Sequence, residues 1–219
     1  MQSLGPKVII DNLPLLLDGL GNTLLIALLS MVISVVTGFL FGIGRTSRIK
    51  ILKLITDVYL EAFRIVPIMV WLFAMYFFVP RALGISVSGE VAAIVIFVMW
   101  GTAEMGDIVR GGLQSLPKSQ VEAGLSVGLS RPQLFVYIQL PQAMKRIIPG
   151  GISLFTRMIK TTSLVVLIGV IDVIKRGQQV IERTREAFWI YGFLFIIFFI
   201  ICYPLSLSSK KLERKWANE

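Results

Sequence analysis

Charged and hydroxyl side chains that interrupt apolar runs are the residues of this sequence that could do chemistry. They are Glu61, Arg64, Glu104, Lys160, Thr161 and Ser163. Both charge signs together with hydroxyl donors suit a zwitterionic ligand. A charge inside a membrane costs about 3 kcal/mol, so it should face a partner, a cavity or water. We therefore predict that these six side chains line the path of a polar ligand. An equally good interpretation is that Arg64 and Lys160 pair with Glu61 and Glu104 for structural reasons.

Three further charged residues, Asp57, Arg110 and Arg157, lie in or beside the same apolar runs. Long side chains near the end of a membrane span commonly extend to the lipid headgroups. We expect these three to do so.

Residue types that serve most metal sites and acid–base enzymes are scarce. The sequence has no histidine and one cysteine, Cys202, which argues against His-based catalysis and most zinc or haem sites. It also lacks the pattern G-x-x-x-x-G-K-[ST] that cradles nucleotide phosphates. We predict no metal site, no cofactor bound to this chain and no enzymatic activity of its own.

The composition is that of an integral membrane protein. Of 219 residues, 55% are hydrophobic and 16% are charged, and the mean hydropathy is +0.79. The net charge of +9 comes from short basic clusters between apolar runs, as in cytoplasmic loops, so we expect a lipid bilayer and no nucleic acid as partner. The prediction is an all-α fold with about five transmembrane helices in a single domain, residues 1–219.

Five long runs poor in charge predict these spans, and the basic clusters orient them. By the positive-inside rule, the N-terminus lies outside and the C-terminus inside. Residues 1–18 should then form an extracytoplasmic surface segment with no cleaved signal peptide, 111–146 a cytoplasmic loop and 210–219 a cytoplasmic tail. The expected spans are 19–44, 54–80, 91–108, 147–171 and 187–209.

The distribution of charge among the spans predicts their roles. The first and fifth carry none and can face lipid, whereas the middle three should form the working core. Gly38 and Gly42 form a G-x-x-x-G pair, which we interpret as ordinary helix packing rather than a dimer face. We find no inverted repeat and predict no broken helix in the sequence.

The loop 111–146 contains start and stop signals for two short helices. Ser119 and Glu122 have capping-box spacing, so a helix should begin at Gln120 and run to about Val127. Gly128 can take the left-handed conformation that closes it. 

A second helix should follow at once. Ser130 and Gln133 repeat the capping spacing, and Pro141 should end this helix. With the small residues Ala123 and Gly124 on its surface, the first helix suits docking into a groove on another protein. A plain loop on the lipid headgroups fits the local pattern equally well.

Resemblance to a known family separates these two readings. The run from Glu122 and Ala123 through Gly128 to Leu140 and Pro141 resembles the EAA loop of ABC importer permeases. The resemblance implies a MetI-like ABC importer permease fold, in which this loop is the coupling helix held in a cleft of the ATPase subunit. The coupling residues would be Glu122, Ala123, Gly124, Gly128, Leu140 and Pro141, although the family usually has alanine at position 124.

Other segments are similar to the polar amino acid uptake permeases. These are Gly19-Leu20 with Asn22-Thr23-Leu24, Phe63-Arg64 with Pro67, Glu104 with 108–112, and Lys160 with 162–164. The chain departs from that family near Ser153, where asparagine is frequent, and at Thr161, where aspartate is frequent. 

The resemblance implies an ATP-driven importer in a bacterial cell membrane, moving a polar amino acid delivered by an extracellular binding protein. The implied partners are a cytoplasmic ABC ATPase dimer, which carries ATP and Mg, and a second permease subunit, identical or not. The alternative is an ion-coupled secondary carrier or channel. An intramembrane enzyme ranks last because no nucleophile motif is present.

Overall fold

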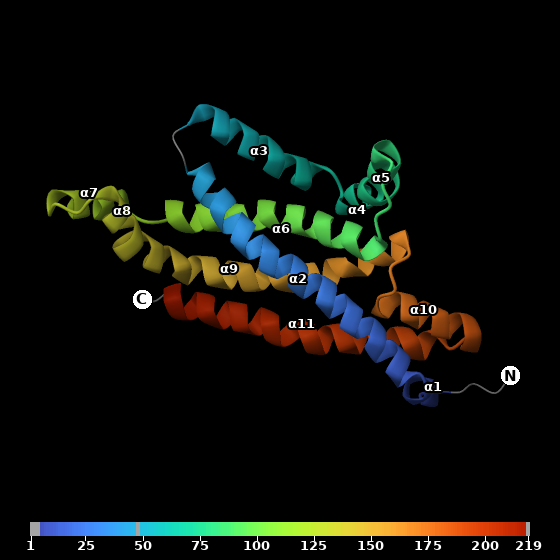
Figure 1. Ribbon diagram of the computed structural model, residues 1–219. Helices are drawn as coiled ribbons and strands as arrows, with labels where there is room; N and C mark the ends of the chain where they lie inside the picture. Colours follow the sequence, from blue (N-terminus) through green and yellow to red (C-terminus); the bar gives the residue numbers. More distant parts are fainter. Residues whose placement is uncertain (1–4, 47–48, 218–219) are drawn as a thin grey trace.

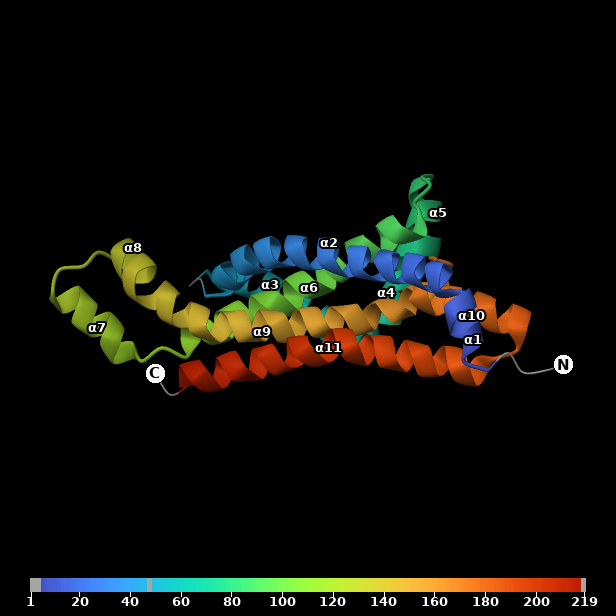
Figure 2. The ribbon, with the colours of Figure 1, turned by 90° about the horizontal axis from the view of Figure 1, so that it is seen from below.

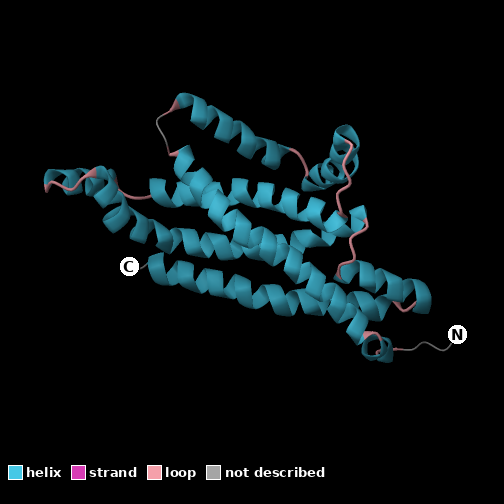
Figure 3. Ribbon diagram, viewed as in Figure 1, coloured by secondary structure: helices cyan, strands magenta, loops and turns pink. Residues whose placement is uncertain are grey.

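Long helices running side by side make up the protein. The structure, a computed structural model, describes residues 5–46 and 49–217, and within these ranges it contains helices and turns but no strand. The long axis of the bundle runs between one end that carries the C-terminus and another that carries the N-terminus (Figures 1 and 2). Figure 3 shows how short most of the loops are. The helices that form the bundle are α2 (Leu13–Arg45), α3 (Lys50–Ile65), α6 (Gly89–Gln114), α9 (Leu140–Thr161) and α11 (Ala187–Ala217).

The span count agrees with the sequence prediction. Four helical segments are long and apolar enough to cross a membrane, and a bent helix pair raises the number to five. The all-α membrane fold is therefore confirmed. The fourth span is longer than expected because helix continues on both sides of α9, so that Arg131–Ile168 forms one segment. 

Close contact between α2 and α6 organises the centre of the bundle. A Cβ atom on Gly38 would lie 2.5 Å from Met105 Cβ, and one on Gly42 would lie 2.6 Å from Val109 Cβ. These glycines let the two backbones approach, which agrees with the packing interpretation of the G-x-x-x-G pair. 

The prediction that the first span faces lipid is wrong in part, because α2 packs at the centre. One third of its most apolar stretch (33%) is buried, compared with 11% for α11, which does face outward as expected. Ser30 and Ser34 of α2 are buried as well. An absence of charge therefore did not distinguish a central helix from a peripheral one.

The second span is broken, which the sequence analysis did not predict. Helix α3 ends at Ile65, and α4 (Ile68–Phe73) starts after Val66 and Pro67 at an angle of 101° between the two helical pieces. Proline has no amide hydrogen and pushes the residue before it out of the helical region, and Val66 accordingly has φ −84° and ψ 126°. The ring of Phe63 stacks on Trp71 across the break, with 4.8 Å between centroids.

Beyond the break, α4 packs on the bundle, where Leu72 is fully buried, and the chain then projects as a short arm. The arm consists of a π-helical turn (η1, Ala74–Phe78) and α5 (Val79–Leu83), which Gly84 ends at φ +67°. Figure 1 shows this arm standing away from the long axis near the N-terminal end. 

Loop residues at the N-terminal end are held by the first turns of α2. The Asn22 side chain donates to the carbonyl of Ile171 (3.0 Å), and the amide of Val173 donates to Thr23 Oγ1 (3.1 Å). A Cβ on Gly19 would lie 2.7 Å from the carbonyl oxygen of Asp172. The Gly19, Asn22 and Thr23 motif thus anchors the loop before α10 (Val173–Thr184). 

The expectation of a surface segment over residues 1–18 is wrong for its second half. Residues 1–4 lie outside the described part of the chain, and α1 (Lys7–Asp11) is a short separate helix. Helix α2 already begins at Leu13, with Pro14 in its first turn, where a missing amide hydrogen costs no helical bond. Asp18 lies within it and forms an ion pair with Arg176 of α10 at 2.6 Å.

Asp172 is a buried carboxylate at the N-terminus of α10. Its Oδ1 accepts a hydrogen bond from the Lys175 amide (2.8 Å), while Oδ2 has no hydrogen-bond partner among the described residues. Burial raises the pKa of Asp172 to about 6. At acid pH Asp172 is protonated in the folded and the unfolded protein, and its burial carries no charge penalty. As the pH rises from the unfolded-state pKa toward 6, the unfolded state loses its proton first, and the free energy of unfolding falls. 

We predict that Asp172→Asn stabilises the protein at neutral pH and changes little at pH values near 4. Asparagine keeps the helix cap and removes the charge, and a shift of this size corresponds to about 3 kcal/mol. Thermal unfolding in detergent, measured for both forms across this pH range, tests the prediction. Parallel pH profiles for the two proteins would contradict it.

Candidate functional site

Two acidic residues on α6, one turn apart, hold arginines from three other helices. Asp107 accepts hydrogen bonds from Arg45 Nη1 (2.7 Å) and Arg64 Nη2 (2.6 Å). Arg45 also reaches Asp57 through Nη2 at 2.7 Å. The Arg45 side chain is 3% exposed, so these carboxylates supply the partners that a buried guanidinium requires.

Glu104 completes the network on the side of α9. Its Oε2 accepts a hydrogen bond from Arg157 Nη2 (2.6 Å), and its Oε1 lies 3.8 Å from Arg64 Nε. The Arg157 guanidinium also lies 5.8 Å from the centre of the Trp100 ring, within the range of a cation–π contact. Arg157 and Arg64 are 49% and 42% exposed, whereas Glu104 is 14% exposed. This part of the network is therefore open.

The six residues predicted to line a ligand path do not form one cluster. Arg64 and Glu104 lie in the network just described, whereas Glu61 is exposed on α3 and makes no ion pair with any described residue. The Thr161 hydroxyl donates to the Arg157 carbonyl (2.9 Å), and the Ser163 hydroxyl donates to the Lys160 carbonyl (2.8 Å). Both hydroxyls are thus engaged with their own backbone.

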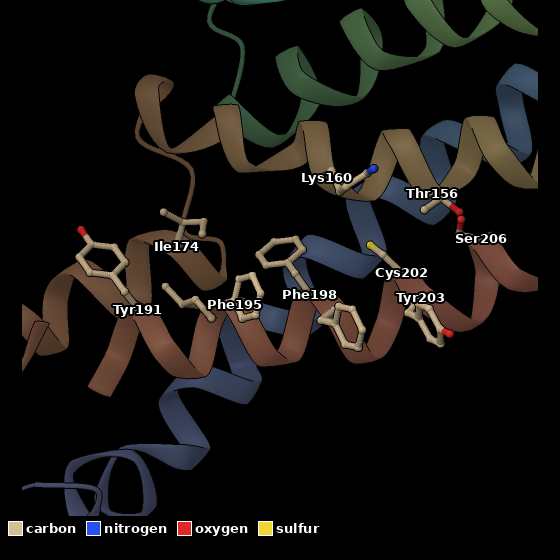
Figure 4. A pocket seen from close by; sticks show the side chains of 11 residues that line it. Thr156, Lys160, Ile174, Tyr191, Phe195, Phe198, Cys202, Tyr203 and Ser206 are labelled. Atoms are coloured by element: carbon tan, nitrogen blue, oxygen red, sulfur yellow. The ribbon is translucent and has the colours of Figure 1, made fainter. Parts of the chain in front are cut away.

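Lys160 belongs to a different environment. It lines a groove of about 560 Å³ between α9 and α11, whose walls are mostly aromatic and aliphatic side chains. Figure 4 shows Lys160 and Thr156 on one side and Phe195, Phe198 and Cys202 on the other. Among the described residues, no carboxylate lies within ion-pair distance of Lys160, so the proposed pairing of Lys160 with Glu104 is wrong.

Two charges assigned to the headgroups, Asp57 and Arg157, belong to the ion-pair network instead, and Arg110 lies 3.9 Å from Asp107. Arg45 was not among the residues singled out from the sequence. The available signal was that Glu104 and Asp107 are three residues apart and so share one face of a helix. Two carboxylates on one face of a membrane helix need basic side chains from the helices that pack against that face.

The segment between α6 and α9 contains the helix predicted to couple, in a form slightly different from that expected. Helix α7 covers Lys118–Ser126 and starts directly after Pro117. No side chain caps it, so the predicted capping box of Ser119 and Glu122 is not formed. The extended backbone of Pro117 (φ −60°, ψ 133°) starts the helix two residues earlier than Gln120.

The end of α7 is as predicted. Gly128 has φ +86°, and its amide donates to the carbonyl of Leu125 (3.0 Å), while the Leu129 amide donates to the carbonyl of Gly124 (3.1 Å). These two bonds form a Schellman motif, which needs a left-handed residue at the position of Gly128.

Gly124 faces inward, contrary to the expectation that it lies on the docking surface. A Cβ there would lie 2.5 Å from Leu134 Cδ1, because α7 packs at this point on α8 (Arg131–Leu134). Leu134 is 2% exposed, so alanine would require the Leu134 side chain to shift within this contact. This contact gives a physical reason for glycine where the family usually has alanine, while Ala123 is exposed as expected.

Pro141 does not end the second helix. Ser130 and Gln133 do form the predicted capping box at its start, but the helix passes through a π-helical turn (η2, Phe135–Gln139) straight into α9. The wider π turn lies just before Pro141, where the missing amide hydrogen and the ring would disturb a regular helix. Leu140 and Pro141 are therefore the first residues of α9.

The segment predicted to couple to an ATPase, residues 118–141 (the coupling segment), extends beyond the bundle at the end that carries the C-terminus (Figures 1 and 2). Apolar side chains of this segment are exposed, among them Val127 (78%) and Tyr137 (72%). Exposed apolar groups on a projecting helix pair are typical of a surface that contacts another protein. 

We predict that Arg45→Leu destabilises the protein strongly, because it leaves Asp57 without this partner and Asp107 with one arginine fewer. The expected loss is about 3 kcal/mol or more, measured as a lower midpoint of thermal unfolding in detergent. Lys50→Leu, at an exposed position of α3, is the matched control and should change the midpoint little. Equal effects of the two substitutions would contradict the structural role of Arg45.

Comparison with known proteins assigns the family. The family model "Binding-protein-dependent transport system inner membrane component" matches residues 34–217. The probable glutamine ABC transporter permease protein GlnP of Bacillus subtilis (strain 168) is 32% identical over 206 residues, which cover 93% of this chain and 94% of that protein. The glutamine transport system permease protein GlnP of Escherichia coli (strain K12) is 33% identical over 204 residues, or 93% of each chain.

Solved structures agree with this assignment. An amino acid ABC transporter crystallised with histidines matches with a TM-score of 0.90 and 26% identity, over 98% of this chain and 100% of that one. The MetNI methionine ABC transporter matches at a TM-score of 0.75 and 19% identity, which supports the fold alone. The chain therefore belongs to the family of binding-protein-dependent transport system inner membrane components and is a permease subunit of the ABC importer type.

Proposed function

We propose that this chain translocates a polar amino acid, with glutamine as the first candidate, in an importer driven by a separate ATPase. The similarity to glutamine permeases over more than nine tenths of the chain carries this proposal. An extracellular binding protein delivers the amino acid, and a second permease subunit completes the path. ATP and Mg²⁺ bind the partner ATPase dimer.

The proposed orientation places the coupling segment in the cytoplasm and the N-terminus outside the bacterial inner membrane. The projecting end carries Lys118, Arg131 and Lys145, and the tail of α11 adds Lys210 and Lys211. Clusters of this kind are retained on the cytoplasmic side. An ATPase could then reach α7 without crossing the bilayer.

Mechanical coupling follows from the continuity of the helix after Gly128. One helical segment runs from Arg131 to Ile168, so a displacement of its cytoplasmic end is carried to Arg157 at the ion-pair network. We propose that the ATPase grips α7 through its exposed residues Glu122 and Ala123 and that the segment moves as a lever. Gly124 and Leu134 keep the two short helices together during that movement.

An ion-coupled carrier or channel is the second candidate, and one observation favours it. The second span is broken at Pro67, and broken helices are common in secondary transporters. The two proposals differ in their energy source. 

Transport by reconstituted protein tests the choice between them. Proteoliposomes holding the permease with its ATPase subunit should take up labelled glutamine only when ATP and the binding protein are both supplied. A panel of the other amino acids under the same conditions identifies the preferred substrate. Uptake that follows an ion gradient with no ATPase present would favour the carrier.

We predict that Gly128→Val abolishes ATP-driven uptake while the protein still inserts into the membrane. Valine at φ +86° strains the turn that closes α7 by about 1–2 kcal/mol, so the helix can no longer present one fixed surface to the ATPase. Glu122→Lys, which reverses an exposed charge on α7, should have a similar effect. Uptake and stimulation of ATP hydrolysis in proteoliposomes are the measurements.

Gly5→Val is the matched control, because Gly5 also has a positive φ (+56°) but lies at the opposite end of the bundle. It should leave uptake unchanged. Normal uptake by both Gly128→Val and Glu122→Lys would count heavily against a coupling role.

A further inference from the structure

Arg157 has unused binding capacity. Only its Nη2 forms a hydrogen bond within the described part of the chain, to Glu104, so Nε and Nη1 have no partner there. The side chain is 49% exposed although it lies in a membrane span. A half-exposed charge at such a depth must face a water-filled cavity or a polar partner, since lipid would oppose it.

Glu104 offers the opposite charge at the same place. It is 14% exposed and contacts Arg157 at 2.6 Å and Arg64 at 3.8 Å. If Arg157 moves away, Arg64 is still close enough to compensate part of the charge on Glu104. The pair can therefore open without leaving a carboxylate isolated in the membrane, which would be strongly unfavourable.

The free amino acid has the complementary pair of charges on one carbon atom. Its α-carboxylate suits the Arg157 guanidinium once Nη2 leaves Glu104, because Nη1 and Nη2 together bind a carboxylate in bidentate geometry. Its α-ammonium suits a carboxylate such as that of Glu104. One ion pair within the protein would be exchanged for two between protein and ligand, with the Trp100 ring supporting Arg157 from below.

We propose that Arg157 and Glu104 together form the receptor for the α-carboxylate and α-ammonium groups of the transported amino acid. The proposal rests on the proposed function, and it assigns the part of the substrate that all amino acids share. The side chain of the substrate would be recognised elsewhere.

The other charged groups of the spans fit this task less well. Arg45 is 3% exposed and already binds two carboxylates, Asp57 and Asp107. Lys160 is exposed in the groove of Figure 4 but has no acidic neighbour among the described residues to receive an ammonium group. Arg64 and Asp107 are partly exposed as well (42% and 34%), but Asp107 already accepts hydrogen bonds from two arginines. Arg157 and Glu104 combine opposite charges, unused donors and exposure with a carboxylate that accepts one close hydrogen bond within the described part of the chain.

Direct binding to the purified permease–ATPase complex without the binding protein tests the proposal. The probes are labelled L-glutamine and, in parallel, labelled L-arginine. Competitors for glutamine are γ-aminobutyramide, which lacks the carboxylate, and glutaric acid monoamide, which lacks the ammonium group. Agmatine and δ-guanidinovalerate are the corresponding competitors for arginine.

Arg157→Gln should weaken amino acid binding by about tenfold or more, as expected when a hydrogen bond between charged groups is lost. It should leave the affinity for the analogue without a carboxylate unchanged. Glu104→Gln should show the reverse pattern, with the analogue that lacks the ammonium group unaffected. Arg157→Lys should recover part of the affinity, and Lys211→Gln, in the tail of α11, serves as the unchanged control.

A purely structural pair would give a different result, because its loss would weaken all ligands alike. Such a uniform loss overturns the proposal, and so does a carboxylate-specific loss in Lys160→Gln instead of Arg157→Gln. Absence of binding of both amino acids to the unmodified complex overturns it as well. ATP-driven uptake by the complete importer would still hold in each case, so failure of this assignment is distinguishable from failure of the proposed function.

Discussion

Compensation of charge inside a medium of low polarity is the constraint on which the rest of this structure depends. Asp107 and Glu104 lie on one face of α6, and they bring α2, α3 and α9 together through Arg45, Arg64 and Arg157. Each of these charges would be costly alone in a membrane. Their mutual pairing fixes where three helices sit around α6, and the open side of the network is where we propose that the amino acid binds.

Small residues make this arrangement possible. The approach of α2 to α6 at Gly38 and Gly42 is close enough that one Cβ atom would separate the helices. The guanidinium of Arg45, one turn beyond Gly42, then reaches Asp107 at 2.7 Å. A larger residue in either position would move the buried arginine from its carboxylates, so packing and electrostatics act on the same contact.

Two prolines in the spans have opposite effects on the helices that contain them. Pro67 breaks the second span and turns the chain away from α3. Pro141 follows directly after a π-helical turn, and the helix stays continuous. The difference lies in the backbone before each proline. The extended residue Val66 precedes Pro67, whereas a widened helix precedes Pro141 and continues directly into α9.

The sequence by itself determined the all-helical membrane fold, the number of spans within one, a short helix between the third and fourth spans and the glycine that closes it. These follow from composition, run length and local spacing, which act over a few residues. Tertiary structure alone decided which charges meet, because Arg45 and Asp107 are 62 residues apart in the chain and Glu104 and Arg157 are 53 apart. It also decided that Gly124 faces Leu134 and that α2 is central. Helix rotation and packing set these contacts, and no local pattern encodes them.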